Sequence, residues 1–443
     1  MNSHSQTRRR FLQRALVTGI AFPFVARRSW AISPNERIRH VSFGAGGMAG
    51  ADLGSIAGHP SVDVIAAAEI DSNTAASFQK KFPKAKAYAD WRELLDKEGK
   101  HFDTANVSTP DHMHAPIAMS AMQLGKHVYV QKPLTHEVFE SRRLREFAKE
   151  RGLVTQMGIQ VHSDGAYRTA VAGVQSGAIG KVKSVHTWSN KKWGDPTPRP
   201  DREDPLPTQI NWDHWCGAAT KVPYLGGGYY HPGNWRKRLA FGTGTFGDMG
   251  CHIYDPVYKA LALTAPLSLR SEGPAPRGHN WAINARIKYV FPATAFTVAP
   301  TVEVTWYDGD EKPPQEIAAL LGGDALPGQG SILIGTEGVM LIPHVSAPQL
   351  YPKKKFVEVK LPAVPGANHW HQFIDACRGK GETSAGFDYS GLLTEAVLLG
   401  GIATHFPNQT LEWNAAKLTF ANSKDATALV RREYRKGWEV AGL

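Results

Sequence analysis

The segment from Ile38 to about Gly158 alternates short apolar runs with helical stretches, and this alternation constrains the fold most strongly. Val62–Ile70 is a near-continuous apolar run with β-branched residues, as expected of a parallel strand buried on both faces. Strands separated by helices predict right-handed βαβ units and a doubly wound parallel sheet. The expected strands are Arg39–Gly44, Val62–Ile70, Phe102–Ser108, His127–Gln131 and Leu153–Met157. The first expected helix follows the glycines after Gly44 and ends near Ala57. The others span Ala75–Phe82, Pro116–Leu124 and His136–Glu150.

The pattern changes after Gly158, where a second domain is expected. We therefore divide the chain into residues 36–158 and 159–443. The second part is predicted to be an α+β domain with a large, mainly antiparallel open sheet. Its expected helices are Asp255–Leu263 and Tyr389–His405, and its expected strands are Trp281–Phe291, Thr301–Trp306, Ser331–Gly335, Gly338–Ile342 and Phe356–Leu361.

The positive charge of the chain is concentrated at its N-terminus. Six arginines and no acid lie within residues 1–31, and removing them from the formal net charge of +11 leaves +5. No basic stripe with regularly spaced aromatics is present, so a nucleic-acid partner is not expected. The basic cluster Arg431, Arg432, Arg435 and Lys436 is predicted to be a solvated face. The three cysteines lack metal-binding spacing and are expected to be buried thiols. One disulfide among them is the alternative; they are Cys216, Cys251 and Cys377.

Residues 1–31 have the features of an export signal. Thr7–Leu12 (TRRRFL) resembles the twin-arginine motif, and the apolar run Ala15–Ala26 is too short and too interrupted to span a bilayer. Ala31 is the expected cleavage site. A basic, disordered arm is the alternative. The signal predicts a periplasmic protein, exported already folded, with no stable membrane insertion after cleavage.

A glycine-rich turn follows the first expected strand. Gly44, Gly46, Gly47, Met48 and Ala49 fit the pattern G-x-G-x-x-[G/A] between a strand and a helix. Gly44 permits a tight turn, Gly46 lets the backbone approach a pyrophosphate, and Ala49 allows close packing. The helix N-terminus offers free N–H groups to phosphates. The turn therefore predicts a dinucleotide site.

Glu69 stands 25 residues after Gly44, at the end of the second expected strand. A carboxylate there can accept both ribose hydroxyls and would repel a 2′-phosphate, which favours NAD over NADP. Asp71 is the competing candidate.

Three further segments complete a family pattern. They are Ser108–His114 (STPDHMH), Gly125–Pro133 (GKHVYVQKP) and Gly247–His252 (GDMGCH). Together with the glycine turn they resemble the Gfo/Idh/MocA oxidoreductases, and the Trp-rich middle resembles a twin-arginine-exported branch. The resemblance implies an NAD-binding Rossmann domain, a second domain that carries the substrate site, an enzyme of the NAD(P)-dependent oxidoreductase class, and a homodimer or homotetramer.

The resemblance carries catalytic roles to three residues. Oxidation of a secondary alcohol needs a base that reaches the hydroxyl and a cation that stabilises the developing alkoxide. His252 suits the base and Lys132 suits the cation. Asp248 lies four residues before His252, so on a helix both would project from one face. It is expected to orient the imidazole or to bind a sugar hydroxyl.

The resemblance also assigns cofactor contacts. The family motif E-K-P reads Gln131-Lys132-Pro133 here, which removes a negative charge beside Lys132 and predicts a less stabilised ammonium. The expected cofactor-binding residues are Gly44, Gly46, Gly47, Met48, Glu69, Thr109, Pro110, His114, Gln131 and Lys132. No metal is expected, because His112 and His114 have no third ligand at suitable spacing.

Aromatic residues concentrate between the two expected domains. Residues 184–241 hold five of the twelve tryptophans. Aromatic faces pack on the C–H faces of sugars, whereas the alternative is a core or subunit-interface cluster. The expected substrate-binding residues are Gln160, His162, Trp235, Arg236 and Asp248.

These observations predict an NAD-dependent oxidoreductase of a sugar or sugar derivative, with a tightly held and recycled cofactor. A redox-neutral glycoside hydrolase or lyase acting through a transient keto-sugar is the first alternative, with Tyr229, Tyr230 and His231 as candidates for its extra base. A non-catalytic carbohydrate-binding protein is the second.

Overall fold

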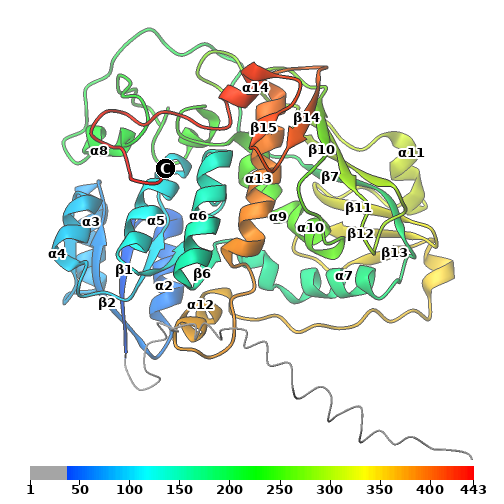
Figure 1. Ribbon diagram of the computed structural model, residues 1–443, viewed down its shortest axis with the longest axis horizontal. Helices are drawn as coiled ribbons and strands as arrows, with labels where there is room; N and C mark the ends of the chain where they lie inside the picture. Colours follow the sequence, from blue (N-terminus) through cyan, green and yellow to red (C-terminus); the bar gives the residue numbers. More distant parts are fainter. Residues whose placement is uncertain (1–36) are drawn as a thin grey trace, which may run out of the picture.

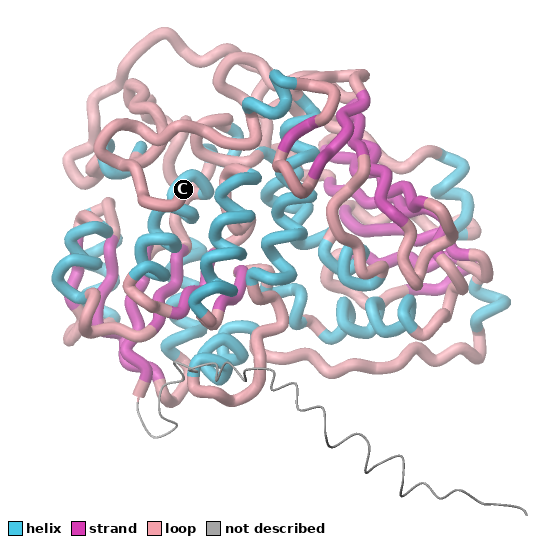
Figure 2. The backbone as a smooth tube through the Cα atoms, in the orientation of Figure 1, coloured by secondary structure: helices cyan, strands magenta, loops and turns pink. Residues whose placement is uncertain are grey.

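The computed structural model describes residues 37–443, which fold into two sheets joined by packed helices (Figures 1 and 2). The expected export segment, residues 1–31, lies outside the described residues. No helix within residues 37–443 combines the length and the apolar character that crossing a membrane requires.

The N-terminal sheet is wholly parallel, with strand order β3-β2-β1-β4-β5-β6. The order reverses at β1 and β4, so the doubly wound prediction is confirmed, and ligands of such sheets bind at this switch point. The strands are β1 (Ile38–Phe43), β2 (Val62–Ala68), β3 (Lys86–Tyr88), β4 (Thr104–Val107), β5 (His127–Val130) and β6 (Thr155–Met157). The helices are α2 (Gly47–Ala57), α3 (Ser72–Lys81), α4 (Trp91–Glu98), α5 (His114–Gln123) and α6 (Val138–Arg151). The sequence patterns missed β3 and α4, which are short.

The second sheet has nine strands in the order β13-β12-β11-β7-β10-β9-β8-β14-β15. Only β7 and β10 pair in parallel, so the mainly antiparallel prediction is also confirmed. The strands are β7 (Val182–Ser189), β8 (Ser268–Ser271), β9 (Arg286–Pro292), β10 (Thr301–Asp308), β11 (Gln329–Gly335), β12 (Val339–Pro343), β13 (Gln349–Tyr351), β14 (Thr410–Asn414) and β15 (Thr419–Phe420).

One expected strand of the second sheet is wrong. The 3₁₀ turn η6 (Lys353–Phe356) ends at Phe356, and residues 357–361 form no strand. Val357 and Val359 are exposed, so their alternation has no sheet face to bury. Alternating apolar residues alone do not make a strand without a pairing partner.

The two parts share one continuous core where α6 meets α13 (Phe387–Thr404), side by side in the centre of Figure 1. Arg142 on α6 forms a bidentate pair with Glu395 on α13. The other helical elements are η1 (Asp111–Met113), η2 (Gln160–Ser163), α7 (Gly165–Gln175), α8 (Trp212–Cys216), η3 (Asn234–Lys237), the π-helical turn η4 (Phe246–Gly250), α9 (Cys251–Ile253), α10 (Asp255–Ala260), α11 (Gln315–Ala318), η5 (Ala319–Leu321), α12 (His369–Cys377) and α14 (Lys424–Ala428). All three cysteines are buried and unpaired.

Candidate active site

The glycine turn joins β1 to α2 at the carboxyl edge of the parallel sheet. Gly44 has φ +91°, and a Cβ there would lie 3.0 Å from the Ala49 Cβ and from the Ser108 carbonyl oxygen. Only glycine fits that backbone without strain. No side chain caps the N-terminus of α2, which leaves its N–H groups free to bind phosphate oxygens.

The two acids after β2 have different environments. Glu69 lines the cleft beside the glycine turn, and its carboxylate accepts hydrogen bonds from the backbone N–H groups of Ala45 and Asp71. The Asp71 carboxylate instead caps α3 by accepting from Asn73 and Thr74. Glu69 is therefore the better placed of the two alternatives, and its ribose contact remains a prediction.

A cleft of about 540 Å³ extends from Glu69 to His252. Among the predicted site residues, those that line it are Gly44, Gly46, Gly47, Met48, Glu69, Thr109, Pro110, His114, Gln131, Lys132, Gln160, Trp235, Arg236 and His252. Asp248 and His162 do not line it. His162 bonds through Nδ1 to both carboxylate oxygens of Asp255 at 2.9 Å, so its predicted substrate contact is not supported by its position.

The cleft lining fits a polar ligand such as NAD. Thr109 Oγ1, Gln160 Oε1 and His252 Nδ1 are buried and have no hydrogen-bond partner in the described chain. Buried polar atoms are normally satisfied, so such atoms in a cleft indicate where a ligand binds. Trp91 Nε1 is a further unpartnered atom in this lining, at the start of α4, and the sequence patterns did not single out Trp91.

Lys132 follows β5 and reaches across to the second domain. Its Nζ lies 2.5 Å from Asp248 Oδ1 and 3.2 Å from the Asp248 carbonyl oxygen. Arg236 Nε also donates to Asp248 Oδ1, at 3.2 Å. Burial acts to raise the pKa of Asp248, but the charges of Lys132 and Arg236 outweigh it and hold that pKa well below its usual range. Asp248 thus supplies the carboxylate that the first position of the QKP motif lacks.

Gln131 has a different partner from Lys132. Its Nε2 donates to Asp52 Oδ2 at 2.9 Å, and its Oε1 accepts from the Lys132 backbone N–H at 3.1 Å. Ser108 Oγ and Trp370 Nε1 also donate to Asp52, each at 2.8 Å. Burial raises the pKa of Asp52, against these hydrogen bonds. A carboxylate at position 131 would face Asp52, which explains why an amide is favoured here.

His252 lies in α9, directly after the π-helical turn η4. Burial lowers the pKa of His252 well below its ordinary value, and the charge of Lys132 lowers it further. The imidazole is therefore neutral and can accept a proton. Within residues 37–443 no hydrogen bond joins His252 to Asp248, whose carboxylate faces the two cations instead. Asp248 pairs directly with Lys132, and its negative charge also favours the protonated form of the nearby His252, against burial and Lys132. Its orienting role stays a prediction.

His114 connects two loops of the cleft. Its Nδ1 lies 2.8 Å from the Pro133 carbonyl oxygen, and its Nε2 lies 2.8 Å from the Thr109 carbonyl oxygen. Each ring nitrogen thus lies within hydrogen-bond distance of a backbone carbonyl oxygen in the loops that carry the predicted cofactor contacts. His114 positions these loops, although it also lines the cleft.

The aromatic segment, residues 190–241, covers the cleft. Its apolar cluster contains Trp212, Trp215, Tyr230, Trp235 and Phe241. Trp212 and Trp215 stack at 4.6 Å, which is core packing, whereas Trp215 and Trp235 also line the cleft. Packing in a core is therefore seen for this cluster, and a sugar contact of Trp235 stays a prediction. The segment is tied to the first domain through the Ser72 N–H and the Gln209 carbonyl oxygen.

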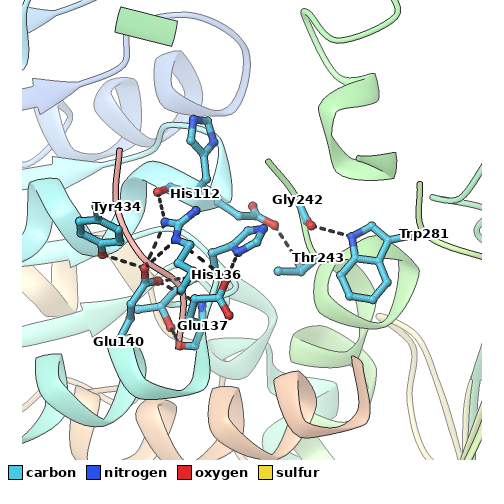
Figure 3. A network of polar contacts seen from close by, with 11 residues as sticks. His112, His136, Glu137, Glu140, Gly242, Thr243, Trp281 and Tyr434 are labelled. Carbon is cyan, nitrogen blue, oxygen red and sulfur yellow. Dashed lines mark hydrogen bonds and ion pairs between the residues drawn. The ribbon is translucent and has the colours of Figure 1, made fainter. Parts of the chain in front are cut away.

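The C-terminal tail, residues 429–443, holds this segment in place, and the predicted solvated face there is wrong for two of its four residues. Arg432 donates to Glu140 Oε1 and to the His112 carbonyl oxygen, in the network drawn in Figure 3. Arg435 donates to Asp213 Oδ1 at 2.7 Å and to the Gly217 carbonyl oxygen at 3.0 Å. The sequence could not predict these ion pairs, because the acidic partners lie far from the tail in the chain.

Tyr434 completes the tail's attachment, because its hydroxyl donates to Glu140 Oε1 at 2.7 Å (Figure 3). On the cleft side of the same region, Thr243 donates to Asp111 Oδ2 and Trp281 Nε1 donates to the Gly242 carbonyl oxygen. The elements around the cleft are therefore joined by polar contacts from distant parts of the chain.

Comparison with known proteins shows which family model the first domain matches. Residues 38–159 match the Gfo/Idh/MocA family model, described as an oxidoreductase family with an NAD-binding Rossmann fold. The N-terminal domain is an NAD-binding Rossmann domain of the Gfo/Idh/MocA type. The glycine turn, the parallel sheet and the cleft at its switch point agree with this assignment.

Two curated relatives of the Gfo/Idh/MocA domain match part of the chain. Levoglucosan dehydrogenase of Pseudarthrobacter phenanthrenivorans is 26% identical over 188 residues, which cover 42% of this chain and 40% of that enzyme. The dTDP-3,4-didehydro-2,6-dideoxy-alpha-D-glucose 3-reductase of Streptomyces violaceoruber is 30% identical over 154 residues, 34% of this chain and 44% of that enzyme. The chain thus spans less than half the length of these relatives.

A solved structure extends the likeness of fold across both domains. The WlbA dehydrogenase from Bordetella pertussis, in complex with NADH and UDP-GlcNAcA, superposes with a TM-score of 0.61 at 14% identity. The match covers 86% of this chain and 99% of that one. It shows a shared two-domain fold.

Proposed function

We propose that this protein is an NAD-dependent oxidoreductase that acts on a secondary alcohol of a sugar or sugar derivative. The observation that carries the proposal is the meeting of Lys132 and His252 at one end of a cleft whose other end is formed by the glycine turn and Glu69. The printed names of the two curated relatives, a levoglucosan dehydrogenase and a dTDP-sugar reductase, support a sugar substrate.

The residues divide the chemistry between them. When bound, NAD supplies the hydride acceptor. The neutral imidazole of His252 takes the hydroxyl proton, and the Lys132 ammonium stabilises the negative charge that develops on the oxygen. Asp248 holds Lys132 in place through the ion pair and the contact to its carbonyl oxygen. The aromatic segment covers the cleft and limits the access of water to it.

The proposal includes a periplasmic location, reached by twin-arginine export of the folded protein with NAD bound. NAD released outside the cytoplasm would be lost. We therefore also propose that the enzyme binds NAD tightly and regenerates it without releasing it. The basic motif Thr7–Leu12 supports it. The homodimer or homotetramer implied by the family resemblance also remains a proposal.

The redox-neutral alternative needs a second base beside the substrate. Tyr229 and Tyr230 do not line the cleft. His231 lines it, but its Nε2 lies 4.0 Å from Oδ2 of Asp71, the residue whose backbone N–H binds Glu69. We therefore prefer net oxidation. The non-catalytic alternative is less favoured because Lys132 and His252 come together in a covered cleft.

Mass spectrometry of nucleotide released from denatured protein tests the cofactor, and NADH formation with a sugar panel tests the activity. We expect near-stoichiometric NAD(H), and loss of turnover in Lys132→Met and His252→Asn with NAD still bound. Lys192→Met, at an exposed lysine paired with Asp310, serves as the control. Unchanged turnover in both site variants would refute the assignment.

A further inference from the structure

Arg236 lines the cleft and contacts two aromatic rings and Asp248. Its guanidinium lies 4.3 Å from the Trp235 ring centroid and 5.5 Å from the Trp193 ring centroid. Its Nε is bound to Asp248, which also binds Lys132. The two ring contacts and the ion pair together restrict the position of the guanidinium.

The two Nη groups of this guanidinium have few acceptors in residues 37–443. Nη2 makes no hydrogen bond within the described chain, and Nη1 reaches only the Gly233 carbonyl oxygen, at 3.4 Å. Trp193 Nε1, under the same guanidinium, is buried and also unpartnered. A guanidinium and an indole N–H can only donate, and Arg236 lines the cleft, so a ligand that offers oxygen acceptors would suit its free donors.

The local charge points the same way. Two cations, Lys132 and Arg236, share the single carboxylate of Asp248. The other nearby acid, Asp111, accepts from Thr243, and burial raises its pKa; it makes no hydrogen bond to Arg236 in residues 37–443. A neutral sugar hydroxyl would satisfy one donor and leave this excess uncompensated.

We propose that Arg236 binds a carboxylate of the substrate, so that the substrate is an acidic sugar such as a uronic or aldonic acid. This inference rests on the proposed function, because it names the substrate class of the same site. A planar carboxylate matches the free edge of one guanidinium, and a phosphate, which can also bind an arginine with two hydrogen bonds, is distinguished by the test below. Gln160 Oε1, buried and unpartnered in the same lining, would accept from a sugar hydroxyl.

Matched acidic and neutral sugars test the proposal on the NAD-loaded enzyme. D-glucuronate is compared with D-glucose, D-galacturonate with D-galactose, and D-gluconate with D-sorbitol. Glucose 6-phosphate serves as the phosphate probe. Binding is measured by calorimetry and oxidation by NADH formation. We expect at least one acid to bind about 10-fold or more tightly than its neutral counterpart, as a charge-assisted pair provides.

Variants of Arg236 make the assignment specific. Arg236→Gln is expected to abolish the preference for the acid mainly through KM, and Arg236→Lys to restore part of it because the charge returns without the planar fork. Arg202→Gln, an exposed arginine of the same segment paired with Asp204, is the control and should keep the full preference. A preference that survives Arg236→Gln, neutral sugars used equally well, or tighter binding of the phosphate would each overturn the proposal.

The two readouts separate this inference from the proposed function. Oxidation of neutral sugars without acid preference leaves the oxidoreductase standing and removes the acidic substrate. Arg236-dependent binding of an acid without NADH formation supports the carboxylate site and contradicts the oxidation.

Discussion

Lys132 and Asp248, 116 residues apart in the chain, are joined by a buried ion pair with an Nζ–Oδ1 distance of 2.5 Å. One comes from the Rossmann domain and the other from the π-helical turn η4 of the second part. The pair therefore links the cofactor domain to the substrate side of the cleft, and it depends on both parts being assembled.

Removing the carboxylate of this pair should impair catalysis more than folding. In Asp248→Asn, Lys132 and Arg236 would lose their shared counter-ion and face each other as like charges. We expect kcat to fall about 100-fold, the scale of a lost positioning or proton-transfer group, with NAD still bound. Steady-state kinetics measures this, and Asp310→Asn at an exposed ion pair is the control. Wild-type kcat in Asp248→Asn would show that the pair is only structural.

The neutral state of His252 predicts the acid side of the pH profile. The base is active when deprotonated, so activity is lost as pH falls through its pKa in the folded protein. Burial and the Lys132 charge put that pKa below 6.5. We therefore expect kcat/KM to stay level as pH falls through 6.5 and to decline only at lower pH. A decline centred at or above 6.5 would contradict the role given to His252.

The Gln131–Asp52 contact predicts that restoring the family's glutamate would be harmful here. Gln131→Glu places a second carboxylate against a buried one, and we expect a loss of about 2 kcal/mol in the free energy of unfolding. Asp52→Asn in the same chain should recover most of that loss, because the donor and acceptor are exchanged. Urea unfolding of the two single variants and the double variant measures the coupling. If the losses of the two single variants simply add in the double variant, the two side chains are not coupled and the prediction is wrong.

Arg432 should matter for stability although it lies far from the chemistry. Arg432→Ala leaves the buried Glu140 carboxylate without its cation, and we expect a loss of about 3 kcal/mol. Lys436→Ala, at an exposed position of the same tail, should change the free energy by less than about 0.5 kcal/mol. Thermal and urea unfolding compare the two. Equal effects would restore the solvated-face interpretation for the whole cluster.

The two acids after β2 predict different effects on cofactor binding. Glu69→Gln should weaken NAD binding about 10-fold and reduce the discrimination against NADP, because the carboxylate that accepts the ribose hydroxyls is lost. Asp71→Asn keeps a good helix cap and should leave NAD affinity unchanged. Fluorescence titration of NAD-free protein with both cofactors measures this. The reverse ranking would assign the ribose contact to Asp71.

Much of the fold could be predicted because its signals are local. The glycine turn, the buried apolar runs and the helices between them each depend on neighbouring residues, and the parallel sheet follows from their alternation. Phe356–Leu361 shows the limit, because its alternation lacked a strand to pair with. His162 shows the same limit for the site, since its partner Asp255 lies 93 residues away.

Short-range pattern and side-chain chemistry were enough to predict the class of the first domain, the position of the dinucleotide turn and the residue types available for proton transfer. Which of these groups lie in contact depends on the packing of distant segments. Asp248 pairs with Lys132, Gln131 with Asp52, and Arg432 with Glu140, in each case across more than 75 residues of chain. Such pairs form because burial makes an unpaired charge or amide costly, and which partner is available depends on how distant segments pack.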